Sequence, residues 1–97
     1  MRYTVIWQSL AKFHARAITD YIAQDSKAAA RKALTAIIDA PQPLLEMPYI
    51  GRIGRVEGTR ELVVGNYPYI LAYRIKNDVI EILDVIHTAR EWPTGFH

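Results

Sequence analysis

The stretch "TRELVVGNYPYILAYRIKNDVIEILDVI" (residues 59–86) decides the fold. It holds three runs rich in β-branched and aromatic residues, which is the composition typical of strands, at 59–65, 67–75 and 79–86. The segments between them, "GN" (65–66) and "KND" (76–78), consist of turn-forming residues. Because such short connections join antiparallel neighbours, the stretch predicts a three-stranded antiparallel meander.

The chain before this meander predicts a helical hairpin. Residues 9–24 and 27–40 have helical patterns, and Ser9 and Ser26 stand where helix N-caps belong. Apolar residues recur at spacings of three and four, which predicts one buried face on each helix. In the first helix the predicted face consists of Leu10, Phe13, Ala17 and Tyr21, flanked by Ile18 and Ile22. In the second it consists of Ala30, Leu34, Ile37 and Ile38.

The remaining segments complete a single α+β domain over residues 1–97. "YTVIW" (3–7) reads as a strand, and the glycine-rich "YIGRIGRVEG" (49–58) reads as a loop. The predicted order is therefore β-α-α-β-β-β, with an N-terminal helical hairpin packed on a twisted antiparallel sheet. One face of the sheet is expected to stay open.

Composition excludes several classes of protein. The 97 residues are 51% hydrophobic and 23% charged, as in a folded domain, and no apolar run is long enough for a membrane span. The chain has no cysteine and no recognisable signal peptide, so we expect a cytoplasmic protein. Its histidines lie far apart in the sequence, so we expect neither a metal nor another cofactor. The net charge of +2 permits nucleic-acid or acidic protein partners without requiring them.

One set of side chains could carry chemistry. It consists of Arg52, Arg55, Arg60, Arg74, Arg90 and His87. Arginines bind phosphates bidentately, and a histidine can transfer protons during RNA cleavage. Glu61 could also act as a base, but it faces away from its neighbour Arg60 if both lie on a strand. The alternative is structural: the arginines form surface ion pairs, and His87 only ends a strand.

The C-terminal tail adds two large residues to this set. Trp92 and Pro93 favour anchoring of the tail on the domain, and Trp92 also joins the arginines as a candidate binding residue.

Residues 47–93 resemble the RelE/ParE superfamily of toxins from bacterial type II toxin–antitoxin modules. The resemblance is carried by "P-x-x-G-R", "G-T-R-E-L-V-V", "Y-x-I-x-A-Y-R" and the closing "I-x-x-V-x-H-x-x-R-x-W-P". Their order and spacing are specific, and the predicted β-α-α-β-β-β order extends the resemblance over essentially the whole chain. It implies a toxin held inactive by a cognate antitoxin. The antitoxin's C-terminal segment would wrap the toxin, and operator DNA would be contacted only through the antitoxin.

Two activities occur on this fold, so the resemblance leaves the target open. RelE-like members cut mRNA on the ribosome, whereas ParE-like members inhibit DNA gyrase. In a RelE-like toxin, His87 would be the catalytic proton-transfer group and Arg60 its helper. The central strands carry Glu61, Val63 and Ile70 where RelE-like nucleases concentrate basic residues. This difference favours the ParE-like branch, with Arg52, Arg55, Arg74, Arg90 and Trp92 as candidate binding residues. A third hypothesis is a degenerate toxin that only binds its antitoxin.

Overall fold

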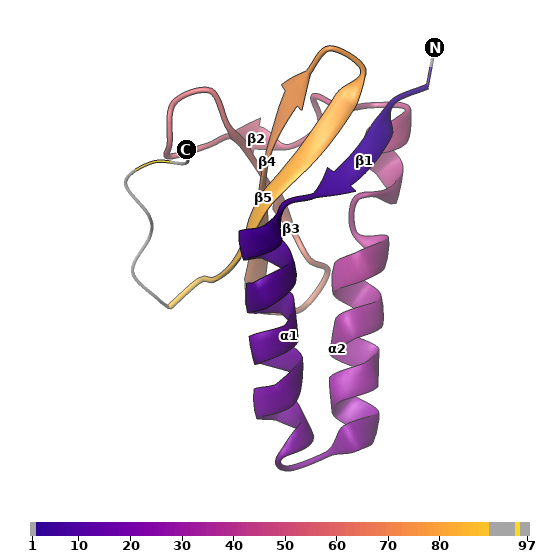
Figure 1. The fold of residues 1–97 in the computed structure, drawn as a ribbon, viewed down its shortest axis with the longest axis vertical. Helices are drawn as coiled ribbons and strands as arrows, with labels where there is room; N and C mark the ends of the chain where they lie inside the picture. Colours follow the sequence, from indigo (N-terminus) through magenta and orange to yellow (C-terminus); the bar gives the residue numbers. More distant parts are fainter. Residues whose placement is uncertain (1, 90–94, 96–97) are drawn as a thin grey trace.

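The computed structural model describes residues 2–89 and 95, and within them five strands form one sheet (Figure 1). The strands are β1 (Thr4–Trp7), β2 (Arg52–Ile53), β3 (Arg60–Val63), β4 (Tyr69–Lys76) and β5 (Val79–His87). Their order across the sheet is β1-β5-β4-β3-β2. β3, β4 and β5 form the predicted antiparallel meander. The left-handed residues Gly65 (φ 49°) and Asn77 (φ 58°) lie in its turns.

The α+β class is confirmed, and two details of the sheet differ from the prediction. β1 pairs with β5 in parallel, so the sheet is mixed and not antiparallel throughout. A parallel pair needs a long connection, and here nearly the whole chain lies between the two strands. The second difference is β2, a strand that lies inside the predicted loop 49–58 and pairs with β3. A strand of two residues is too short to show the alternation by which strands are recognised.

The helical hairpin consists of α1 (Ser9–Ala23) and α2 (Lys27–Asp39), followed by the short 3₁₀ helix η1 (Gln42–Leu45). α1 packs on β5, and α2 packs beside α1, so that the tip of the hairpin projects beyond the sheet (Figure 1). The predicted cap at Ser26 is confirmed, because its Oγ accepts a hydrogen bond from the Ala29 amide at 3.1 Å. The cap predicted at Ser9 is wrong, because Ser9 is the first residue of α1 and Gln8 occupies the N-cap position. No helix within the described residues is long and apolar enough to cross a membrane.

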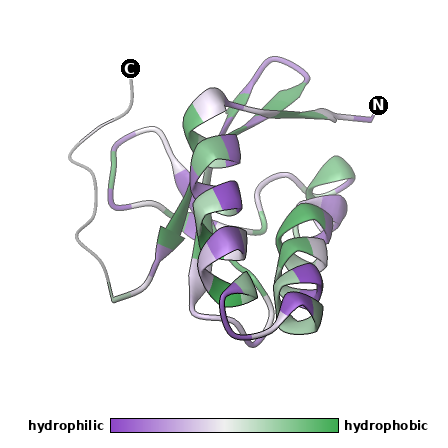
Figure 2. Ribbon diagram, turned by 60° about the horizontal axis from the view of Figure 1, so that its bottom comes forward, coloured by the Kyte–Doolittle hydropathy of each residue, from purple (hydrophilic) through white to green (hydrophobic). Residues whose placement is uncertain are grey.

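The face that α1 buries is not the predicted one. Phe13 and Tyr21, expected in the core, are 68% and 70% exposed. The buried residues of α1 are Ala11, Ala15 and Ile18, of which only Ile18 was expected, at the flank of the predicted face. Small side chains on this face let the helix approach the sheet closely. α1 therefore has two apolar faces, and hydrophobic segments recur along it in Figure 2.

The core lies between the hairpin and the sheet, and Tyr73 is its largest fully buried side chain. The Tyr73 hydroxyl donates to the Pro48 carbonyl at 2.8 Å and accepts from the Gly51 amide at 3.0 Å. Burial raises the pKa of Tyr73 above its ordinary value of 10.0, so the hydroxyl keeps the proton that it donates. One phenol thereby fixes the segment that leads into β2.

Tyr73→Phe tests this contact, since it removes only the hydroxyl and leaves two buried backbone groups without a partner. We expect the free energy of unfolding to fall by about 1–3 kcal/mol in urea denaturation. Tyr21→Phe is the matched control at an exposed position and should change stability by less than about 0.5 kcal/mol. Equal effects of both substitutions would mean that the Tyr73 hydroxyl holds nothing in place.

Candidate functional site

The hairpin of β2 and β3 is anchored by a buried carboxylate. Glu61 is only 4% exposed, and its Oε1 accepts from Arg52 Nε at 2.9 Å. Its other oxygen accepts from the backbone amide of Arg55 at 2.8 Å. Because both oxygens are engaged, Glu61 serves as an anchor for the loop and is poorly suited to the role of a base. Arg52 and Arg55, predicted as binding residues, are exposed on this hairpin.

Arg60 turns toward the segment that precedes β2. Its Nη1 donates to the carbonyls of Tyr49 and Gly51 at 3.0 and 2.8 Å. The guanidinium carbon lies 5.1 Å from the centre of the Tyr49 ring, in a cation–π contact. Arg60 therefore holds Tyr49 in place and at the same time presents positive charge beside an aromatic ring.

Arg74 belongs to a chain of three hydrogen-bonded side chains that joins β4, β5 and the residue after β1. Its Nε donates to Glu81 Oε1 at 2.6 Å, and Glu81 Oε2 accepts from Gln8 Nε2 at 2.7 Å. The Arg74 hydrogen bond lowers the pKa of Glu81 below its ordinary value of 4.5. Gln8 occupies the N-cap position of α1. Its side chain binds Glu81 and makes no capping hydrogen bond to the helix.

His87 ends β5 beside Tyr69. The two rings meet edge to face with their centres 5.6 Å apart. The His87 Nδ1 accepts from the Ala89 amide at 3.1 Å, which places the proton of the neutral ring on Nε2. This hydrogen bond engages Nδ1, so any proton transfer by the ring would have to use Nε2. The arrangement fits a strand end better than a general base.

The structure does not bring Arg60 and His87 together. Arg60 pairs with Tyr73 on β4, whereas His87 pairs with Tyr69 on the same strand. Four residues of β4 span about 13 Å, and the two strand spacings between β3 and β5 add about 10 Å across the sheet. Since both side chains are also held by their own neighbours, they do not form one catalytic centre. Arg90 and Trp92 lie outside the described residues.

His14 and Asp84 form a contact that the sequence did not indicate. The His14 Nδ1 lies 2.5 Å from Oδ1 of Asp84, which is 4% exposed and also accepts from the Val85 amide. The pair ties α1 to β5 at the sheet bulge. Among residues 2–89 and 95, no group of three His, Asp or Glu side chains is placed to hold a metal ion.

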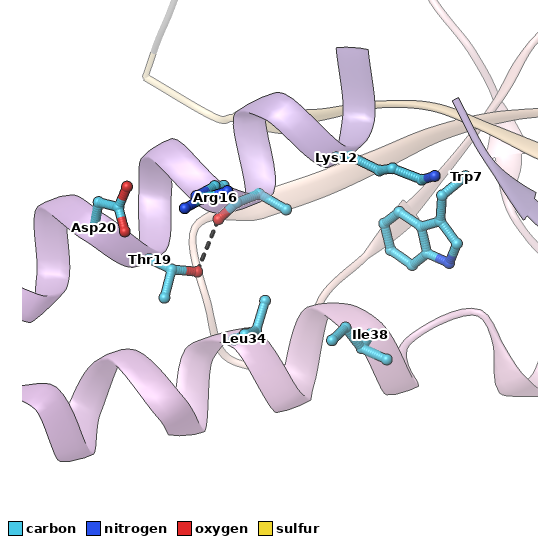
Figure 3. Close-up of a pocket in the computed structure, with 8 residues that line it drawn as sticks. Trp7, Lys12, Arg16, Thr19, Asp20, Leu34 and Ile38 are labelled. Atoms are coloured by element: carbon cyan, nitrogen blue, oxygen red, sulfur yellow. Dashed lines mark hydrogen bonds between the residues drawn. The ribbon is translucent and has the colours of Figure 1, made fainter. Parts of the chain in front are cut away.

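A groove between α1 and α2 was also missed (Figure 3). It has a volume of about 620 Å³, and Leu34 and Ile38 of α2 form its wall opposite α1. The wall formed by α1 is partly polar, because Lys12, Arg16 and Asp20 line it together with Ala15 and Thr19, and Trp7 completes the lining. Leu34 and Ile38 were assigned to the core, but Leu34 is only half-buried and Ile38 is 53% exposed.

The other flank of α1 carries the exposed stripe of Leu10, Phe13, Ala17 and Tyr21. Tyr21 connects this stripe to a hollow of about 360 Å³ that reaches Tyr69 and His87. The sequence contained a signal for this exposed apolar stripe. α1 has more apolar positions than one buried face requires, and a helix that is apolar on several sides needs more than one packing partner.

Three comparisons with known proteins agree with this geometry. The family model for the ParE toxin of the type II toxin–antitoxin system parDE matches residues 5–92. Y4kP of Sinorhizobium fredii, which carries a toxin description, is 41% identical over 95% of both chains. Toxin RelE2 of Caulobacter vibrioides is 35% identical over 89% of this chain and 96% of its own. A chain from the chromosomal ParDE system of P. aeruginosa superposes with a TM-score of 0.79 at 27% identity, over 88% of this chain and 95% of that one.

The pairing of Glu81 with Arg74 predicts how acid affects stability. A carboxyl whose pKa is lower in the folded state stabilises the fold above its unfolded pKa, near 4.5, and this contribution is lost as the pH falls through the folded value. In urea denaturation from pH 7 to pH 3, Glu81→Gln should therefore show a shallower acid loss than the wild type. Arg74→Gln should flatten the same limb of the curve. Parallel curves for all three proteins would contradict the assignment.

Proposed function

Because the chain belongs to the ParE toxin family of type II toxin–antitoxin systems, we propose that it inhibits DNA gyrase in the cytoplasm until a cognate antitoxin neutralises it. The observation that carries the proposal is the separation of Arg60 from His87. Cleavage of RNA needs proton-transfer and charge-stabilising groups at one phosphate. Inhibition by binding needs only a surface, and it is compatible with arginines that are held as anchors.

The alternative is cleavage of mRNA on the ribosome, favoured by the likeness to a relative described as toxin RelE2. It would require His87 to act as the proton-transfer group. In the described structure, that ring accepts a hydrogen bond from Ala89 and packs on Tyr69. These contacts support a structural role for His87 and weigh against the nuclease.

A supercoiling assay with purified gyrase separates these activities. We expect the wild-type protein to inhibit supercoiling and to trap cleaved DNA, and His87→Ala to inhibit as well as the wild type. His87 is the informative residue because only the nuclease hypothesis gives it chemistry. Absence of any effect on gyrase at large molar excess, together with mRNA breaks in a translation extract that His87→Ala abolishes, would refute the proposal.

Neutralisation by the antitoxin is assigned to α1. Phe13 and Tyr21 expose most of their surface, and the groove of about 620 Å³ lies along the other flank of the same helix. Exposed apolar area of this kind marks protein interfaces. In this family the toxin functions with an antitoxin partner, so we propose that an apolar segment of the antitoxin covers these surfaces. Operator DNA is then contacted only through the antitoxin.

Phe13→Asp tests this assignment with the protein encoded beside this chain's gene as the antitoxin. We expect the variant to lose at least about tenfold in affinity, because the aspartate would be buried without a partner. The antitoxin should raise the melting temperature of the wild type and raise that of the variant less. Thr35→Asp, at an exposed position on α2, is the control. Unchanged binding by Phe13→Asp would remove α1 from the interface.

A further inference from the structure

A second exposed apolar surface lies on the segment that enters β2. Met47, Tyr49, Ile50 and Ile53 fall within seven residues, and their exposed fractions are 57%, 61%, 46% and 80%. β2 lies at the opposite end of the molecule from the tip of the helical hairpin (Figure 1). None of these four residues lines the groove or the hollow that flank α1. Together with Arg60 and Arg74, these four residues are here named the β2 patch.

Part of the β2 patch lines a hollow. Tyr49, Ile53, Arg60 and Arg74 line a depression of about 280 Å³. Ile53 pairs with Arg60 across the ladder between β2 and β3, and the Arg60 guanidinium lies against the Tyr49 ring. Tyr49 and Ile53 thus share this hollow with Arg60 and with Arg74, whose Nε is engaged by Glu81. Such a hollow accepts an apolar side chain with a carboxylate next to it.

The backbone beneath the patch is held in place, although it belongs to a short strand and a loop. Tyr73 binds the backbone at Pro48 and Gly51, and Glu61 binds the Arg52 side chain and the Arg55 backbone amide. A backbone that is already ordered loses little conformational entropy on binding, which favours association with a partner. No core requirement explains why Ile53 is left 80% exposed on this framework.

The composition of the patch selects a protein as its partner. Tyr, Met and Arg are enriched at protein interfaces, and aliphatic side chains gain free energy only against another apolar surface. Phosphate groups would use the arginines but would leave Met47, Ile50 and Ile53 in water. Residues 47–61 contain Arg52, Arg55 and Arg60 against Glu57 and Glu61, and Glu61 pairs with Arg52. Arg60 lines the hollow, so the complementary surface places an acidic group beside it.

We propose that this toxin binds its target through the β2 patch. The target presents an acidic protein surface and inserts an apolar side chain between Tyr49, Ile53 and Arg60. The inference rests on the proposed function, in which that target is gyrase. It assigns target binding to the end of the sheet at β2 and leaves α1 to the antitoxin. It also gives Arg60 a role in binding that does not depend on His87.

Ile53→Asp is the direct test, because it places negative charge at the centre of the hollow without removing a buried group. Its matched control is Val63→Asp, since Val63 is 53% exposed on neighbouring β3 but does not line the hollow. We expect Ile53→Asp to raise the concentration that half-inhibits supercoiling by at least about tenfold, as for a residue at the centre of an interface. Val63→Asp should inhibit like the wild type. Both variants should keep the wild-type affinity for the antitoxin and a similar melting temperature.

The outcomes are distinguishable. If the wild type inhibits gyrase and Ile53→Asp inhibits equally well, the β2 patch is not the target surface although the proposed function stands. Loss of antitoxin binding by Ile53→Asp would assign the patch to the antitoxin. Retained binding that depends on DNA and disappears with added salt would point to phosphate recognition, which also overturns the inference.

If the wild type leaves gyrase unaffected, the proposed function fails first. Should Ile53→Asp fail to fold, Ile53→Ser carries the same test without the charge.

Discussion

The Tyr73 hydroxyl is the contact on which the arrangement of the arginines depends. It is buried under the sheet, yet it fixes the Pro48 carbonyl and the Gly51 amide in the segment outside it. A side chain at Gly51 would meet this hydroxyl, since an added Cβ would lie 2.5 Å from it. From that fixed point the chain enters β2 in register with β3, which brings Arg52 to Glu61 and Ile53 to Arg60. The motif "P-x-x-G-R" therefore describes one packing arrangement.

The arginines divide into those that hold the structure and those that have charge left for a partner. Arg52 pairs with a carboxylate that is almost fully buried, and Arg74 pairs with Glu81. Removing one partner of such a pair leaves a charge uncompensated, so Arg52 and Arg74 stabilise the fold whatever they bind. Arg60 uses only its Nη1 for the two carbonyls that it contacts. Arg60 also lines the hollow, so it can contact a partner while Nη1 keeps these two hydrogen bonds.

The sequence predicted the parts of the fold that depend on local patterns. The meander, the helical hairpin and the Ser26 cap follow from strand composition, helical periodicity and turn residues, and all are present. Periodicity could not choose between the two apolar faces of α1, because it records spacing and not side-chain size. The larger residues suggested the core, whereas close packing against β5 required the alanines. The sheet register is non-local, and it determines that Arg60 and His87 lie far apart.

The separation of α1 from the β2 patch bears on how an antitoxin could neutralise the toxin. The molecule is 40 Å long, and a segment bound along α1 alone would leave the sheet end at β2 uncovered. An extended chain advances about 3.3 Å per residue, so about 12 residues would reach from one end to the other. An extended stretch of this length that continues from α1 and passes the β2 patch without entering its hollow would block the target, and the affinity for the antitoxin would still not depend on Ile53. An antitoxin confined to α1 would have to exclude gyrase sterically. Gyrase and the antitoxin would then compete for the toxin although they contact different residues of it.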